Sequence, residues 1–271
     1  MLTDTHCHLD HEKFFLDLEA VLERAIQAGV GKLLIPGTTL ASSQAALDLA
    51  RGHSTIFAAV GIHPTECKMF DEKSISQLHT LAKDPKVVAI GEIGLDYYWD
   101  TAPHDLQKKV LIEQLSLAGE LQKPVVLHFR EKGDAVEGPC AADLVEILDN
   151  WTAGLRSDRN PLAERPGVLH SFSGSPRLAE QVMEIYFYLG VTGPVTYRKG
   201  RGDLIASLPL ESLLIETDSP FMAPDPYRGK RNEPAYVRLI ADKIAVIHAC
   251  TIEEVAKTTS ENASLVFNWE S

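Results

Sequence analysis

Short apolar runs and amphipathic stretches alternate along almost the whole chain. Residues 87–90 read Val-Val-Ala-Ile, a continuous apolar run that is typical of a strand buried on both faces. Between residues 18 and 26 the apolar side chains recur at intervals of three and four, which indicates a helix with one buried face, and Gly29 follows where such a helix ends. The pattern therefore predicts repeated units of a strand followed by a helix.

Eight such units can be placed in order. The predicted strands are a first strand that begins at Leu2 and ends at His6 and His8, and residues 32–37, 55–61, 87–92, 125–128, 168–170, 187–192 and 213–217. The predicted helices are residues 18–26, 42–50, 74–82, 103–121, 141–150, 176–186, 203–208 and 237–248, with further helical segments after Thr251 and Ser260. Residues 150–166, which contain Gly154, Asn160-Pro161 and Arg165-Pro166, are predicted to be an inserted loop.

The fold class follows from the count of units and from the polar side chains. A length of 271 residues suits a single-domain (β/α)8 TIM barrel over residues 1–271, since about 250 residues are typical of that fold. A doubly wound open sheet would show a similar alternation. Only a closed barrel, however, brings the carboxyl ends of all its strands to one centre. Polar side chains of reactive type stand at the ends of six predicted strands: His6 and His8, His63, Glu92, His128, His170 and Asp218. We therefore predict the barrel.

Composition and charge narrow the class of protein further. The apolar content of 45% and the charged content of 24% are ordinary for a soluble globular protein, and the four scattered cysteines form no C-x-x-C pair. No apolar run approaches the length of a membrane span, and the first strand begins too early to leave room for a signal peptide. We therefore expect a cytoplasmic protein without a membrane partner. The net charge of −12 argues against a protein that coats long nucleic acids, although a small basic site remains compatible with it.

The end of the first strand contains a pair of metal-ligand candidates. Side chains alternate between the faces of a strand, so His6 and His8 share a face with Asp4, whereas Cys7 points the other way and is predicted to pack in the core. Neutral imidazole is the commonest protein ligand for transition metals. A lone His-x-His pair is more simply explained as two solvated or hydrogen-bonded histidines, but the matching side chains at the other strand ends favour a metal site.

Six ligand-type side chains exceed the roughly three protein ligands of one catalytic zinc ion, so we predict two divalent metal ions, either Zn, Mn or Mg. The predicted ligands are His6, His8 and Asp218 for one ion, His128 and His170 for the other, and Glu92 as a bridge between them. The other histidines are predicted to be ordinary core residues: His11, His53, His79, His104 and His248.

A two-metal site of this composition predicts hydrolysis. Water shared by two metals is deprotonated near neutral pH, and the ions can hold the attacking and leaving oxygens of an in-line displacement, as in the hydrolysis of a phosphate ester. The predicted catalytic residues are Glu92, which holds both ions, and Asp218, which positions the attacking water or accepts its proton. Glu216 lies on the same strand face as Asp218 and is placed to orient a ligand imidazole.

Seven motifs occur in order through nearly the whole chain. They are Asp4-Thr5-His6-Cys7-His8-Leu9-Asp10, Gly61-Ile62-His63-Pro64, Gly91-Glu92-Ile93-Gly94-Leu95-Asp96, Leu127-His128, His170-Ser171-Phe172-Ser173-Gly174-Ser175, Glu216-Thr217-Asp218 and Arg228-Gly229-Lys230-Arg231-Asn232-Glu233-Pro234. Together they resemble the TatD-type metal-dependent deoxyribonucleases of the amidohydrolase superfamily. The resemblance implies a TIM barrel, a divalent-metal site at the same six residues, and hydrolysis of DNA phosphodiesters, often from the 3′ end.

The chain departs from the pattern of that family in three places. Phe129 stands where the family commonly has serine, and its outward parity suggests packing. Residues 131–139 are longer than expected and leave the carboxyl end of a strand, so they are predicted to lie on the catalytic face, where they can alter the substrate. Residues 150–166 are predicted to lie on the opposite face, without a catalytic role.

Side chains that follow the strand ends are predicted to hold the end of a single-stranded or frayed DNA. The predicted substrate contacts are His63, Arg130, Tyr197, Arg198 and Arg231. Tyr197 serves equally well as a packing residue, and Lys199, Arg228 and Lys230 are either further phosphate contacts or solvated loop charges. No obligate protein partner is evident from the sequence.

Two other functions remain open. The same metal-activated hydroxide attacks a carbonyl carbon, so a metal-dependent amidohydrolase acting on an amide, ester or lactone is the alternative within enzymes. A non-catalytic binding protein on a barrel scaffold is the alternative outside enzymes. The presence of all six ligand-type residues counts against it, and undetectable bound metal would support it.

Overall fold

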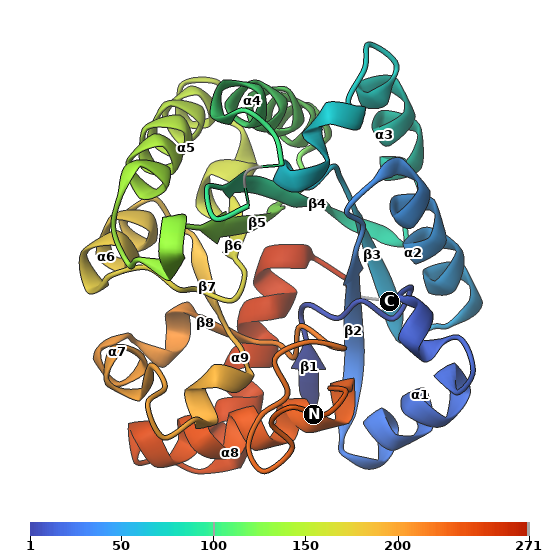
Figure 1. The fold of residues 1–271 in the computed structure, drawn as a ribbon, viewed down its shortest axis with the longest axis vertical. Coiled ribbons are helices and arrows are strands. Elements are labelled where there is room, and N and C mark those ends of the chain that lie inside the picture. The colour runs from blue at the N-terminus through green and yellow to red at the C-terminus, as the bar shows by residue number, and fades with distance from the viewer. Residues whose placement is uncertain (100, 270–271) are drawn as a thin grey trace.

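The computed structural model describes residues 1–99 and 101–269. Within these residues, eight parallel strands form one sheet in the order in which they occur in the chain (Figure 1). The strands are β1 (Leu2–Asp4), β2 (Val30–Pro36), β3 (Ile56–Val60), β4 (Val87–Asp96), β5 (Val125–Arg130), β6 (Gly167–Leu169), β7 (Tyr188–Val191) and β8 (Leu213–Ile215).

The ring closes just beyond the carboxyl ends of β1 and β8. The Thr5 N–H donates to the Ile215 carbonyl at 3.1 Å, and the Asp218 N–H donates to the His6 carbonyl at 2.8 Å. Cys7 and Ser219 form an isolated parallel bridge between the same two segments. This closure confirms the predicted single-domain TIM barrel and excludes the open sheet.

Helices follow the strands and surround the ring, as Figure 1 shows. Those found in the described parts of the chain are α1 (Leu18–Gln27), α2 (Leu40–Gly52), α3 (Ser74–Ala82), α4 (His104–Leu121), α5 (Pro139–Ser157), α6 (Pro176–Glu184), α7 (Gly202–Ser207), α8 (Val237–His248) and α9 (Ile252–Phe267). Not one of these helices combines the length and the apolar character that crossing a membrane requires.

The last helix, α9, covers the amino ends of the strands. Asn262 Nδ2 donates to the Leu213 carbonyl at 2.9 Å, at the start of β8, and Lys32 Nζ donates to the Trp269 carbonyl at 3.0 Å, near the start of β2. A capping box begins the helix, since Thr251 Oγ1 accepts from the Glu254 N–H and the Glu254 carboxylate accepts from the Thr251 N–H. The segments predicted after residues 251 and 260 therefore form one continuous helix.

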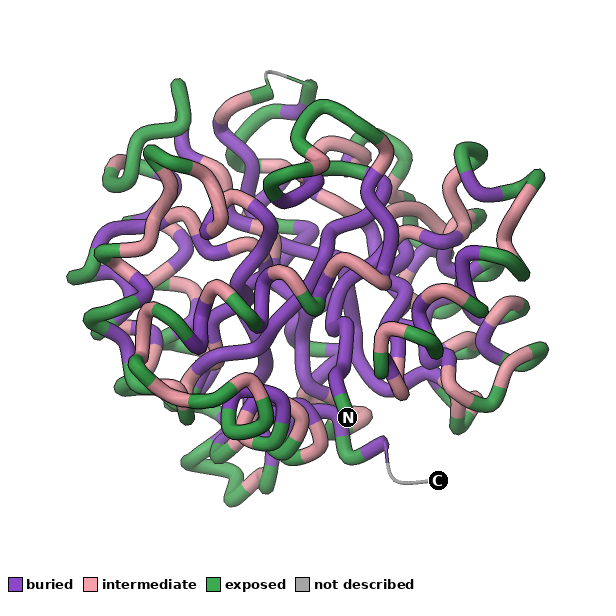
Figure 2. Tube along the Cα trace, turned by 90° about the horizontal axis from the view of Figure 1, so that it is seen from below, coloured by how far each residue is buried: buried purple, intermediate pink, exposed green. Residues whose placement is uncertain are grey.

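The strands are buried on both faces because two apolar clusters meet at the sheet. Along β3, Phe57 and Ala59 belong to the cluster that fills the barrel, whereas Ile56 and Val60 belong to the cluster between the strands and the surrounding helices. Trp269, after α9, completes the inner cluster. Figure 2 shows the same distribution, with buried chain through the centre and exposed chain at the periphery. The amino end of the barrel is thus packed solid, and the carboxyl end is left for a site.

Three predicted boundaries were wrong. Strand β1 ends at Asp4, before His6 and His8, although the chain still follows the ring through the bonds of Thr5 and Cys7. Strand β4 continues past Glu92 to Asp96, and helix α5 continues through Ser157, so only the second part of residues 150–166 is a loop. The longer helix is stabilised where Leu155 packs against Leu162 and Ala163 of the returning chain. The loop joins α5 to β6 and so lies on the amino side of the barrel, as predicted, while residues 131–139 follow β5 on the carboxyl side.

Candidate metal centre

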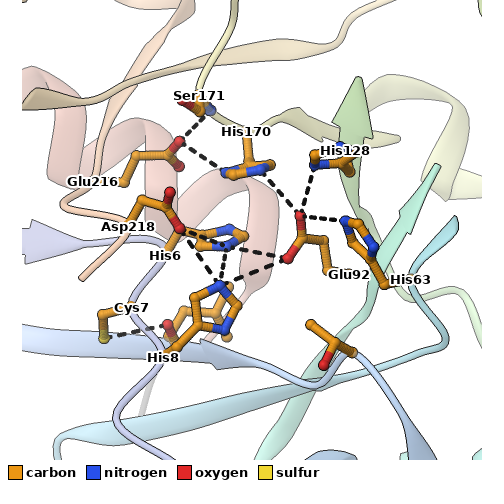
Figure 3. Close-up of polar contacts among 12 residues, drawn as sticks. His6, Cys7, His8, His63, Glu92, His128, His170, Ser171, Glu216 and Asp218 are labelled. Carbon is orange, nitrogen blue, oxygen red and sulfur yellow. Dashed lines mark hydrogen bonds and ion pairs between the residues drawn. The ribbon is translucent and has the colours of Figure 1, made fainter. Parts of the chain in front are cut away.

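A cavity of about 770 Å³ opens at the carboxyl ends of the strands. Five of the six predicted metal ligands line it, namely His8, Glu92, His128, His170 and Asp218, and the sixth, His6, lies fully buried beside them. Figure 3 shows the four histidines gathered around Glu92, with Asp218 beside His6 and His8. The structure therefore brings together every side chain that the sequence assigned to the metal site.

The first group of ligand atoms surrounds Glu92 Oε2. His6 Nε2 and His8 Nε2 lie 3.2 Å apart, and they lie 3.4 Å and 3.8 Å from Glu92 Oε2. Asp218 Oδ1 lies 3.7 Å from His6 Nε2 and 3.5 Å from His8 Nε2. A tetrahedral ion with bonds of about 2.1 Å separates its ligand atoms by about 3.4 Å. The spacing of these donors therefore fits a divalent cation.

The second group surrounds the other oxygen of the same carboxylate. His128 Nδ1 lies 3.0 Å from Glu92 Oε1, His170 Nε2 lies 3.1 Å from it, and His63 Nε2 lies 3.5 Å from it. Glu92 thus faces one set of imidazoles with each oxygen, which is the geometry that a bridging carboxylate needs. His63, predicted to be a substrate contact, lies close enough to Glu92 and His128 to act as a metal ligand as well.

The buried carboxylates and imidazoles of the site shift the pKa values of one another. Burial alone would raise the pKa of Glu92, but the surrounding imidazoles, His170 first, hold it well below its usual value. Burial opposes ionisation of Asp218 too, yet the contact with His8 lowers its pKa. Burial, followed by the neighbouring His170, lowers the pKa of His6. Burial opposes a charge on His8, His128 and His170 as well, but the carboxylates that face them, Asp218, Asp96 and Glu92, raise their pKa values. A cation held here would therefore take the place of protons on these imidazoles.

Glu216 holds the His170 ring from behind, as the sequence predicted. Glu216 Oε1 lies 3.5 Å from His170 Nδ1 and accepts the backbone N–H of Ser171, and Figure 3 shows both contacts. A Cβ at Gly190 would lie 2.4 Å from the same oxygen, so only glycine leaves room for this carboxylate. Glu216 therefore directs His170 Nε2 towards Glu92.

Asp96 orients the His128 ring as Glu216 orients that of His170, a role that was not predicted from the sequence. Asp96 Oδ2 lies 2.8 Å from His128 Nε2, which leaves Nδ1 of the same ring to face Glu92. The alternation along β4 could have identified it, because Glu92, Gly94 and Asp96 share one face of the strand. Because the predicted strand ended at Glu92, Asp96 was not recognised as lying on the same face.

The predicted substrate contacts divide into two groups. His63 and Arg130 line the cavity, whereas Tyr197, Arg198 and Arg231 are not among its lining residues. The Arg231 guanidinium donates to both carboxylate oxygens of Asp17, at 2.8 Å and 2.6 Å, and so is already paired. The Tyr197 hydroxyl donates to the Ala223 carbonyl at 2.8 Å. Substrate contact by Tyr197, Arg198 and Arg231 stays a prediction. In the structure, Arg231 forms an ion pair with Asp17, and the Tyr197 hydroxyl is hydrogen-bonded to the backbone.

Cys7 is buried with its thiol donating to the Leu34 carbonyl at 3.5 Å, which confirms packing. The prediction that the remaining histidines are core residues was wrong, because each retains appreciable exposure. His11 in fact lines the cavity. His53 and His79 lie on the outside, within 3.8 Å and 3.3 Å of glutamate side chains.

A barrel with this donor set at the carboxyl ends of its strands defines a metal-dependent hydrolase. The family described as TatD related DNase matches residues 3–268, and the chain belongs to this family.

Relatives match over nearly their full lengths. The chain is 39% identical to the uncharacterized metal-dependent hydrolase YabD of Bacillus subtilis, over 98% of this chain and 99% of that protein. It is 33% identical to the 3′-5′ ssDNA/RNA exonuclease TatD of Salmonella typhimurium, over 97% and 98%. The crystal structure of the TatD homolog YjjV from Escherichia coli K12 superposes with a TM-score of 0.87 at 35% identity, covering 98% of each chain.

Proposed function

We propose that this protein is a divalent-metal-dependent phosphodiesterase that removes nucleotides from the 3′ end of single-stranded DNA. The observation that carries the proposal is the position of Glu92 between two groups of histidines, with one carboxylate oxygen towards each. The relatives named as 3′-5′ ssDNA/RNA exonucleases support the choice of substrate and polarity.

The charge of the cavity explains why the activity would depend on cations. Six carboxylates line the cavity, from Asp10, Glu66, Glu92, Asp96, Asp134 and Asp218. Among the described residues, Arg130 is the only lysine or arginine in that lining. A phosphodiester would be repelled by such a surface at close range. Two divalent cations held by the six candidate ligands would offset most of this charge, and they would supply the Lewis acidity that activates water and polarises a phosphate.

The chain's own side chains then direct the reaction. The Asp218 carboxylate, which lines the cavity, would orient the attacking water and accept its proton. The water oxygen bonds to phosphorus as the bond to the leaving sugar oxygen breaks, and that oxygen takes up a proton. Arg130, at the edge of the cavity, is placed to hold the neighbouring phosphate.

The test is digestion of end-labelled oligonucleotides by metal-stripped protein to which Mg, Mn or Zn is added back. We expect stepwise shortening of single strands labelled at the 5′ end, immediate release of a labelled nucleotide from strands labelled at the 3′ end, and slower attack on blunt duplexes. Degradation without added metal, or none with any metal, would contradict the proposal. Parallel digestion of RNA strands defines the sugar preference.

One observation favours a second candidate. Arg130 is the single arginine or lysine that lines the cavity among the described residues, and its Nε already donates to Asp134 Oδ1 at 2.8 Å. The cavity would therefore also accommodate an uncharged amide, ester or lactone. Hydrolysis of a neutral ester or lactone by the metal-loaded protein, with no attack on any oligonucleotide, would establish this alternative. The cytoplasmic location and the absence of an obligate protein partner remain predictions.

A further inference from the structure

Two exposed aromatic rings stand at the edge of the cavity. Trp99 is 51% exposed and Phe221 is 45% exposed, and both line the cavity. Trp99 follows β4 and Phe221 follows β8, and these strands lie on opposite sides of the ring in Figure 1. Single exposed apolar side chains are common on protein surfaces. A pair that faces one polar cavity from two sides is a different arrangement and requires an explanation.

The backbone at Trp99 is held in place by the same carboxylate that orients His128. Asp96 Oδ1 accepts the backbone N–H of Trp99 at 2.8 Å and that of Tyr98 at 2.9 Å. The Tyr98 ring packs edge-on against Trp99, with centroids 4.8 Å apart. The Arg130 guanidinium lies 3.7 Å from the Tyr98 ring centroid and 5.7 Å from that of Trp99. Backbone bonds to Asp96 and contacts with Tyr98 and Arg130 thus position Trp99 in the cavity lining, while about half of the residue remains exposed.

The Phe221 ring is anchored on the opposite side in a similar way. The Phe221 N–H donates to the Asp218 carbonyl at 2.9 Å, and Asn232 Nδ2 donates to the Phe221 carbonyl at 2.7 Å. The ring makes edge contacts with His11, at 5.6 Å between centroids, and with His8, at 6.2 Å. Phe221 is thus tied through backbone and ring contacts to two candidate metal ligands.

A flat apolar ring next to a phosphate-cleaving centre matches the chemistry of a nucleobase. Stacking of a base on an aromatic side chain strengthens binding by about 5- to 150-fold per base, and it tolerates any sequence because every base has a flat face. Other exposed aromatic side chains, such as Phe15 and Tyr186, are not part of the cavity lining and lack this relation to the centre.

We propose that Trp99 and Phe221 stack the nucleobases on the two sides of the scissile phosphate. This inference rests on the proposed nuclease function and specifies its substrate as a strand with unpaired bases at its end. Bases within a duplex are already stacked on each other and cannot contact the two rings, so a paired end must fray before it is bound.

The test compares intact and abasic oligonucleotides on the same protein. The Asp218→Asn variant, loaded with metal so that binding can be observed before cleavage, is titrated with a labelled thymidine trinucleotide. A second titration uses the same backbone with abasic sites. We expect the abasic strand to bind at least about tenfold more weakly. Fluorescence of Trp99, identified by its loss in Trp99→Leu, should be quenched by the intact strand only.

Ring substitutions provide the second measurement. In the Asp218→Asn background, Trp99→Leu and Phe221→Leu should each weaken binding of the intact strand by about fivefold or more, and they should reduce its advantage over the abasic strand. Phe15→Leu and Tyr186→Leu are matched controls, since both rings are exposed away from the cavity, and they should leave both affinities unchanged.

The outcomes separate the two proposals. Equal affinity for intact and abasic strands, with wild-type protein still cleaving the intact one, would overturn stacking and leave the nuclease function standing. No cleavage of any oligonucleotide by the metal-loaded wild type would overturn the nuclease function and, with it, the stacking proposal.

Discussion

Glu92 is the side chain that both groups of candidate ligands share. Because each of its oxygens faces one group, Glu92→Ala should remove a ligand from both ions, whereas His170→Ala should remove a ligand from one. We expect a loss of metal affinity of at least about 10–100-fold in the Glu92 variant and a smaller total loss of bound metal in the His170 variant. Elemental analysis after dialysis against limiting metal measures both.

Glu66→Gln is the matched control for this experiment. Glu66 also lines the cavity, but it belongs to neither ligand group and should retain the metal content of the wild type. Equal metal occupancy in the wild type and in Glu92→Ala would rule out the bridging assignment.

Asp218 is proposed to act on the attacking water as well as to contribute to the first ligand group. Asp218→Asn keeps the shape of the side chain but removes its charge and its capacity to accept a proton. We expect turnover to fall by roughly a hundredfold or more while oligonucleotide binding is largely retained. Single-turnover rates and equilibrium affinity, measured with metal content verified, separate the two effects. Near-normal turnover would exclude Asp218 as the group that positions or deprotonates the water.

At this scale the sequence predicted which side chains meet at the candidate metal centre better than it predicted the residues around them. All six candidate ligands converge because each lies at or near the carboxyl end of a strand, and apolar patterning locates the strands to within a few residues. The pairing of Arg231 with Asp17 could not be predicted, since it joins residues more than two hundred positions apart. The place of His63 beside Glu92 similarly depends on a contact between neighbouring strands and not on the sequence near His63.

At the scale of elements, periodicity located each strand and helix but not every end. Helix α5 runs through residues predicted as a loop because tertiary packing of Leu155 outweighs the weak propensity of Gly154. Strand β4 extends to Asp96 because its outer residues pair with β5 as far as Arg130. Local composition does not contain these contacts, and the errors therefore lie at the boundaries and not in the order of elements.

The segment after α9 offers a test of how the barrel is closed at its amino end. Trp269 is buried against Phe57 and Phe267, with ring centroids 5.2 Å and 4.9 Å away. Trp269→Ala should therefore lower the free energy of unfolding by about 3–5 kcal/mol through lost contacts and a residual cavity. Urea denaturation of metal-free protein measures the change without a contribution from metal binding.

Trp269→Phe serves as the control for that measurement. Trp269 Nε1 is buried without a hydrogen-bond partner in the described structure, so phenylalanine keeps much of the apolar contact and removes an unpaired donor. We expect a clearly smaller loss than for alanine. A loss below about 1 kcal/mol for Trp269→Ala would show that this segment does not stabilise the barrel.

At the scale of the whole molecule, charge is distributed so that the protein favours cations over nucleic acid. The net charge is −12, and six of the carboxylates lie in the cavity lining, where Arg130 is the single lysine or arginine among the described residues. Metal-free protein should therefore bind oligonucleotides poorly, and any affinity should appear only with divalent cations. The proposed rings Trp99 and Phe221 would add affinity that does not depend on charge.

This distribution leads to a prediction about salt and strand length. With Arg130 as the only lining lysine or arginine observed among the described residues, few phosphates can be neutralised by the protein itself. The slope of log affinity against log salt for a single strand should therefore be only about −1, and affinity should stop rising beyond a few nucleotides. A fluorescence titration of metal-loaded Asp218→Asn with labelled strands of increasing length, over a series of monovalent salt concentrations, measures both quantities. A steep slope that grows with length would instead reveal an extended nucleic-acid track outside the cavity and refute end binding, because each added phosphate contact releases further counterions.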